Sequence, residues 1–136
     1  MKVFLDTNVL ASAFATRGLC ADLFREVIDS QELIVSDPLF KELRRILVKK
    51  FRAPEDFADD VLAYLEWDTT KAPNGSLSEV SIKDKDDVII LSSALRGGAD
   101  VFVTGDKEVR ALKRIGEMEI LFPREFWEKM RKKTGA

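Results

Sequence analysis

Short apolar runs alternate with longer amphipathic segments along most of the chain, and this alternation strongly limits its fold. The runs at 2–5, 33–35, 101–103 and 119–122 are brief and mostly apolar, as is typical of buried strands. The segments between them repeat apolar residues every three or four positions, which predicts amphipathic helices. Strands that alternate with helices usually pair in parallel through right-handed crossovers. The sequence therefore predicts an α/β fold with a central, mostly parallel sheet of four to five strands flanked by helices.

Capping residues and helix breakers set the expected limits of the helices. Ser36 or Asp37 is a good N-cap, Pro38 suits the first turn that follows, and Gly97 is a typical helix end. With 136 residues, the chain fits one domain over residues 1–136. We expect a strand at 67–70 and helices at 9–14, 21–30, 38–50, 54–65, 84–96 and 107–115, with a last helix from Pro123.

The chain contains no histidine and only one cysteine, Cys20. These facts exclude Ser-His-Asp and Cys-His catalysis, and they also exclude zinc sites built from imidazole or several thiolates. A lone cysteine cannot form an internal disulfide, and no apolar stretch approaches the ~20 residues of a membrane span. We therefore expect a cytoplasmic protein without membrane contact, in which any catalysis depends on carboxylates, hydroxyls, lysines and hard cations.

Four acidic residues that are distant in sequence are expected to meet at one edge of the sheet. Asp6 follows the first strand and Asp106 follows the strand at 101–103, so both emerge at the same edge if these strands are neighbours. Asp87 shares a helix face with apolar residues, where a carboxylate needs hydrogen bonds or a cation. Glu42 borders the apolar stripe of its helix, and its long side chain can reach inward.

Crowded carboxylates repel each other and shift each other's pKa values, and Mg²⁺ or Mn²⁺ relieves that repulsion. Such an ion also supports hydrolysis of a phosphodiester without histidine. Taken singly, each acid has a simpler interpretation: Asp6 and Asp106 are good helix N-caps, Glu42 is a solvated helix residue, and Asp87 faces a helix dipole. The combination in one alternating fold favours a metal site.

These residues resemble the motifs of the PIN-domain family, particularly its toxin-like ribonuclease branch. The family's four motifs are similar, in the expected order, to residues 3–10, 40–43, 84–87 and 98–106. The resemblance implies a three-layer α/β/α fold that cleaves single-stranded RNA with Mg²⁺ or Mn²⁺. It also implies a homodimer and a small antitoxin as partner. The implied metal ligands are Asp6, Glu42, Asp87 and Asp106.

The resemblance also implies supporting residues. Asn8 and Thr104 match polar positions that often support the metals or their waters. The third motif offers Asp84, Asp86 and Asp87, and the spacing to Ile90 and Ala94 favours Asp87 as the ligand and leaves Asp84 in support. The net charge is −2 and no concentrated basic cluster is visible. Cations near the motifs that could contact phosphates, or could equally be ordinary solvated charges, are Arg17, Arg44, Arg45, Lys107 and Arg110.

Two other functions remain open from the sequence. A phosphatase could use Asp6 as nucleophile, but such enzymes usually need a second carboxylate two residues later, where this chain has Asn8. A non-catalytic interaction domain could bind Mg²⁺ in the same acidic pocket. Trp67 and Trp127 could stack bases, but we expect both to pack against the protein.

Overall fold

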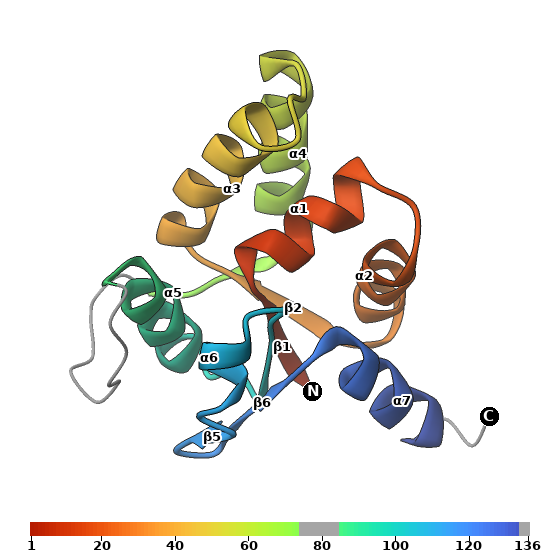
Figure 1. Cartoon of the computed structure of the whole chain (residues 1–136), viewed down its shortest axis with the longest axis vertical. Coiled ribbons are helices and arrows are strands. Elements are labelled where there is room, and N and C mark those ends of the chain that lie inside the picture. The colour runs from red at the N-terminus through yellow and green to blue at the C-terminus, as the bar shows by residue number, and fades with distance from the viewer. Residues whose placement is uncertain (74–84, 134–136) are drawn as a thin grey trace.

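The chain forms a twisted sheet with helices around it, as Figure 1 shows for a computed structural model that describes residues 1–73 and 85–133. Among these residues the sheet has six strands in the order β3-β2-β1-β4-β6-β5. All neighbouring strands are parallel except β5 and β6. The strands are β1 (Lys2–Leu5), β2 (Glu32–Val35), β3 (Thr70–Lys71), β4 (Val101–Val103), β5 (Arg114–Ile115) and β6 (Met118–Leu121). The predicted α/β class with a mostly parallel sheet is confirmed, but the sheet has six strands rather than the predicted four to five, because β5 forms where a helix was predicted.

Seven helices cover this sheet within the described residues. The first helix, α1, contacts both α2 and α3, while α3 also contacts α4 and α5, and α2 contacts α7. The sheet residues between them, such as Phe4 and Phe102, are fully enclosed, and these two rings stack at 5.4 Å between centroids. The helices are α1 (Thr7–Ala15), α2 (Leu19–Ser30), α3 (Asp37–Lys49), α4 (Glu55–Asp68), α5 (Lys85–Arg96), α6 (Lys107–Arg110) and α7 (Pro123–Lys133).

The strand order reverses at β1. The chain passes from β1 to β2 and β3 on one side, and then crosses to β4 and β6 on the other. Leu5 pairs with Val103 at the end of β1 and β4, so the residues that follow these strands leave the sheet side by side. Such a switch point in a parallel sheet is where ligands usually bind.

The segment after Asp106 differs from the predicted helix over 107–115. Helix α6 ends at Arg110, and Lys113 adopts a left-handed backbone with φ 63°. Gly116, at φ 59°, then turns the chain so that β5 pairs antiparallel with β6. A residue with positive φ cannot continue a right-handed helix, so the apolar spacing at 107–115 was misleading.

The end of α4 also differs from prediction. The helix continues to Asp68, and the expected strand at 67–70 is reduced to the two residues of β3. Trp67 is 91% exposed, so the expectation that it packs against the protein is wrong. Trp127 does pack against the core, with the Arg131 guanidinium 5.7 Å from its ring.

Among the helices described, none has the length and apolar character that a membrane crossing requires.

Candidate active site

The hydroxyl of Thr104 links the carboxylate of Asp6 to the backbone of Asp106 at the switch point. The backbone N–H of Asp6 donates to the carbonyl of Val103 at 2.8 Å, which fixes the end of β1 against β4. Thr104 Oγ1 donates to Asp6 Oδ2 at 2.7 Å and accepts from the backbone N–H of Asp106 at 3.0 Å. One enclosed hydroxyl thus holds both acidic residues in place.

Asp6 is partly buried and accepts hydrogen bonds on both oxygens. Its Oδ1 accepts from the backbone N–H of Thr7 at 2.8 Å, at the start of α1. Desolvation raises the pKa of Asp6, the hydrogen bonds from Thr104 and Thr7 lower it, and the nearby charge of Asp106 raises it further. The balance leaves the pKa above its ordinary value, so the negative charge of Asp6 is poorly compensated.

Asp106 is exposed and caps the short helix α6. Its Oδ1 accepts from the backbone N–H groups of Glu108 and Val109 at 2.8 and 3.2 Å. The N-cap role predicted for a single aspartate is therefore present, and the carboxylate still lies close enough to Asp6 to affect its pKa. Asp106 can therefore cap α6 and at the same time lie beside Asp6.

Glu42 and Asp87 lie on α3 and α5, two helices that pack against each other. Ser36, the N-cap of α3, accepts a hydrogen bond from Ser93 of α5 at 2.8 Å between the two hydroxyl oxygens. Asp100 follows the end of α5 and is hydrogen-bonded to the backbone of Lys2, which lies at the amino edge of the sheet. The end of α5 therefore lies near the amino edge, and its first turn lies toward the opposite, carboxyl edge. Asp87 therefore lies toward the carboxyl edge of the sheet, as does the start of α3.

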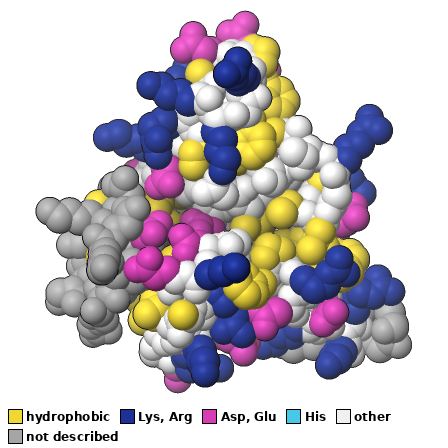
Figure 2. All heavy atoms as spheres, viewed as in Figure 1, with side chains coloured by type: hydrophobic (Ala, Val, Ile, Leu, Met, Phe, Trp, Pro, Cys, Tyr) yellow, Lys and Arg dark blue, Asp and Glu magenta, His cyan; other side chains and the backbone are white. Residues whose placement is uncertain are grey.

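The four predicted ligands do not form a ready-made cage. Glu42 and Asp87 are partly buried, and each has an interaction partner in the protein. Within residues 1–73 and 85–133, no three acidic side chains converge closely enough to hold one ion. Figure 2 nevertheless shows Asp and Glu side chains gathered where α3, α5 and α6 meet. Asp84 and the side chain of Asp86 lie outside the described part of the chain.

Comparisons with known proteins identify the family and the fold. Residues 2–108 match the PIN domain family. The chain belongs to the PIN domain family. Members of this family are generally nucleases. The matched range contains all four predicted ligands, which are Asp6, Glu42, Asp87 and Asp106.

A solved structure with the same PIN domain fold is one chain of the crystal structure of VapBC2 from Rickettsia felis bound to a DNA fragment from their promoter. The TM-score is 0.60 at 15% sequence identity, and the alignment covers 88% of this chain and 97% of that chain. At this identity the likeness shows the fold alone. A search of curated proteins gave no match.

The donor set of this PIN domain fits a hard divalent cation. Asp6 and Asp106 present carboxylate oxygens, and Mg²⁺ commonly binds through one or two carboxylates, with water and substrate phosphate as its other ligands. The poorly compensated charge of Asp6 beside Asp106 favours a cation at this edge. A site of this kind does not need a cage of three or four acids before substrate arrives.

Asn8 has a partner that sequence patterns did not reveal. Its Oδ1 accepts a hydrogen bond from Lys50 Nζ at 2.9 Å, which connects the first turn of α1 to the end of α3. Lys50 thereby places a positive charge beside a motif residue of the PIN domain. The two residues are 42 positions apart, so no local spacing could have predicted the contact.

The five predicted phosphate-binding cations fall into two groups. Arg44 is already paired with Asp59 at 2.9 Å and with Glu55 at 3.6 Å. Arg110 makes two hydrogen bonds to Glu125, at 2.7 and 2.9 Å. The exposed members of the set are Arg17, Arg45 and Lys107.

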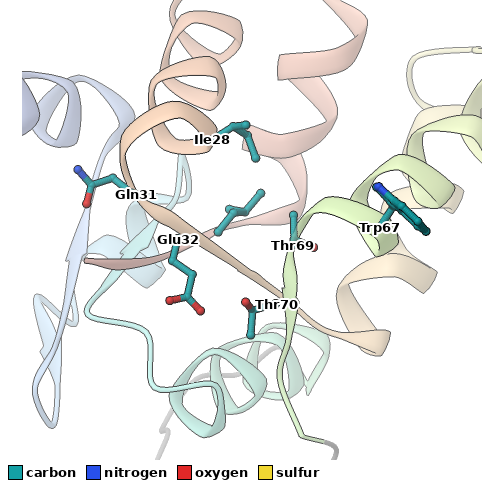
Figure 3. A pocket seen from close by; sticks show the side chains of 7 residues that line it. Ile28, Gln31, Glu32, Trp67, Thr69 and Thr70 are labelled. Atoms are coloured by element: carbon teal, nitrogen blue, oxygen red, sulfur yellow. The ribbon is translucent and has the colours of Figure 1, made fainter.

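A pocket of about 290 Å³ lies far from the carboxylates, at the other edge of the sheet. Figure 3 shows it beside Glu32 and Thr70, the first residues of β2 and β3, with Trp67 directed away from the other labelled side chains. Among the lining residues that the structure describes, Glu32 is the only ionisable one. This pocket therefore lacks the paired carboxylates of the switch point.

Proposed function

We propose that this PIN domain is a divalent-metal-dependent endoribonuclease that hydrolyses phosphodiester bonds of single-stranded RNA. The supporting observation is the pair formed by Asp6 and Asp106, which Thr104 holds together at the switch point. Two carboxylates at a ligand-binding edge suit a cation that must also contact phosphate. The lack of histidine leaves carboxylates as the natural means of activating water.

In this proposal Asp6 and Asp106 bind Mg²⁺ or Mn²⁺ directly, and Glu42 and Asp87 approach the same ion or its waters. When bound, the cation offsets charge that develops on the phosphate and promotes ionisation of water. Thr104 keeps the carboxylate of Asp6 oriented through its 2.7 Å hydrogen bond. Asn8, held by Lys50, is a further polar group at the start of α1.

We also propose that the chain is the toxin of a toxin–antitoxin pair. The resemblance of its motifs to toxin-like ribonucleases and the fold likeness to a chain of VapBC2 support this role. Phe57, Tyr64 and Trp67 lie along one side of α4 and are 39%, 41% and 91% exposed. Large apolar side chains in a row support a protein partner on α4, either a small antitoxin or a second copy.

The test is cleavage of labelled single-stranded RNA with Mn²⁺, with and without a chelator. Asp6→Asn and Asp87→Asn are compared with Asp29→Asn, a matched change at an exposed position of α2. We expect metal-dependent cleavage that is lost in the first two variants and kept in the third. Hydrolysis of small phosphate esters with RNA left intact would instead indicate a phosphatase. Metal binding without either activity would indicate an interaction domain.

A further inference from the structure

A groove of about 450 Å³ between α3 and α4 is lined by a row of cations from α3. Lys41, Arg45 and Lys49 follow one another at intervals of four residues, so they lie on the same side of the helix. Their backbone positions are separated by about 6 Å each along the helix axis. All three are exposed, and in the part of the chain that the structure describes none of them forms an ion pair.

A fourth cation of the groove, Arg44, has a different role. Its guanidinium pairs with Asp59 and Glu55 of α4, which ties the two helices together. The hydrogen bond to Asp59 also raises the pKa of Arg44 above its already high value, so its charge is permanent. Arg44 therefore fixes the spacing between the helices, while the other three cations remain available to a ligand.

The floor of the groove is apolar. Phe40 and Val48 of α3 and Leu62 of α4 line it, and all three are partly buried against the core. A cationic rim over an apolar floor suits a single nucleic-acid strand, whose phosphates need positive charge and whose bases and sugars need apolar contact. An acidic protein segment is the other occupant that such a groove could accept.

The groove begins beside the acidic edge. Lys41 directly precedes Glu42 and lies one turn after the start of α3, whereas Lys49 is at its far end. Figure 2 shows Lys and Arg side chains gathered over α3, next to the Asp and Glu side chains where α3 meets α5 and α6. A strand bound at the carboxylates therefore has a positively charged path directly beside it. This continuity favours nucleic acid over an acidic protein segment.

We infer that Lys41, Arg45 and Lys49 bind successive phosphates of the RNA on one side of the cleaved bond. The inference rests on the proposed function, because it assumes that RNA is bound at Asp6 and Asp106. The three cations span about 12 Å of α3, so only an RNA that extends beyond the carboxylate edge reaches them all. The groove then contributes affinity for long substrates and leaves the reaction at the carboxylates unchanged.

The test is RNA binding by the triple variant Lys41→Gln/Arg45→Gln/Lys49→Gln, made with Asp6→Asn to prevent cleavage. Fluorescence anisotropy is measured with a labelled RNA of about 15 nucleotides, a length within the usual range for single-strand sites, over a series of salt concentrations. Loss of three phosphate contacts reduces the salt slope by about 2, which corresponds to about 40-fold weaker binding at 0.15 M salt. The control is Arg25→Gln/Lys113→Gln/Lys132→Gln, which removes the same charge from exposed positions elsewhere.

Cleavage by the same triple variants without Asp6→Asn separates this inference from the proposed function. If the groove and control variants bind and cleave RNA equally well, the groove does not bind RNA and the inference is wrong, while the proposed nuclease function stands. If only the groove variant loses RNA binding and the wild type does not cleave RNA, the RNA-binding role of the groove is supported and the proposed nuclease function is refuted. If the groove variant keeps RNA binding but loses binding to polyglutamate, the groove takes an acidic protein segment and the inference is wrong.

Discussion

The carboxyl edge of β1 and β4 and the corner between α6 and α7 each bring two ionisable side chains together, with opposite results. At the edge, Asp6 and Asp106 carry the same charge, and desolvation with mutual repulsion keeps the pKa of Asp6 above its ordinary value. At the corner, Arg110 makes two hydrogen bonds to Glu125 and lowers the pKa of that carboxyl to about 2. The two charges at the corner neutralise each other, whereas the two negative charges at the edge do not.

The hydrogen bonds at the two places differ in the same sense. Glu125 also accepts from the backbone N–H of Phe122 at 2.8 Å, so it caps α7 while it pairs with Arg110. Among the described residues, Asp6 accepts hydrogen bonds only from neutral donors, the hydroxyl of Thr104 and the N–H of Thr7. Neutral donors orient a carboxylate without cancelling its charge. The carboxylate of Asp6 is thus held in a fixed orientation with its charge uncompensated, which suits the binding of a cation. The neutralised pair of Arg110 and Glu125 contributes to the fold alone.

The largest expected effect is at the edge. Asp6→Asn keeps the shape of the side chain and removes its charge, so we expect RNA cleavage to fall by about 10³-fold, the size of effect seen when a key electrostatic group is lost. Thermal stability should stay the same or rise, because the cost of desolvating a charge disappears. Cleavage rates and thermal melts of Asp6→Asn and Asp106→Asn measure this. Loss of activity through unfolding would contradict the interpretation.

The next effect concerns two enclosed threonines on either side of Asp6. Thr104 Oγ1 makes two hydrogen bonds, and Thr7 Oγ1 has no hydrogen-bond partner among the described residues. Thr104→Val should lower cleavage by about 10²-fold through misorientation of Asp6, and Thr104→Ser should restore most of it. Thr7→Val should raise stability by about 1 kcal/mol, because it replaces an unsatisfied hydroxyl.

Cleavage assays and urea unfolding curves separate these two threonines. Equal losses of activity in both valine variants would show that the hydroxyl of Thr104 has no special role. Destabilisation by Thr7→Val would show that its hydroxyl has a partner in solution, such as a water molecule. Thr104→Ser distinguishes the hydrogen bond from packing, because it retains the hydroxyl and removes a methyl group.

These residues also show what could be predicted from sequence. The strands that precede Asp6 and Asp106 are short, apolar and flanked by helices, so their pairing and shared edge follow from general rules of parallel sheets. The membership of the PIN domain family was recognised from the same motifs and is confirmed. The ligand role of the four acids as a set stays a prediction, because metal binding depends on side-chain positions that strand order does not determine.

The features that sequence missed arise from tertiary contacts. The pair of Lys50 and Asn8 joins two helices, and the pair of Arg110 and Glu125 joins α6 to α7. Neither pair has a periodic spacing that would reveal it. We expect Trp67 to pack because its residue type favours burial, but its side chain near the end of α4 is 91% exposed. Amphipathic spacing shows which residues share a side and leaves open whether a neighbour covers it.

A smaller effect is expected at the corner between α6 and α7. Because Glu125 already satisfies Arg110, Arg110→Gln should leave RNA cleavage unchanged and lower the melting temperature by about 3 °C. Glu125→Gln should behave similarly, and the double variant should be no less stable than the worse single one. Melting curves and cleavage rates of the three variants test this. A large loss of RNA binding in Arg110→Gln alone would instead restore the predicted phosphate-binding role of this arginine.

The smallest effect is the acid dependence of the same pair. The folded pKa of Glu125 is about 2, below its ordinary value of 4.5, because Arg110 and the N–H of Phe122 favour the ionised form. Its contribution to stability is therefore complete above about pH 4.5 and is lost as the pH falls toward 2. The stability difference between wild type and Glu125→Gln should shrink over this range and should be weaker in high salt, because the side chain is 39% exposed. Urea midpoints at successive pH values measure this difference directly. A difference that stays constant or grows on acidification would mean that capping and packing, rather than charge, hold the corner together.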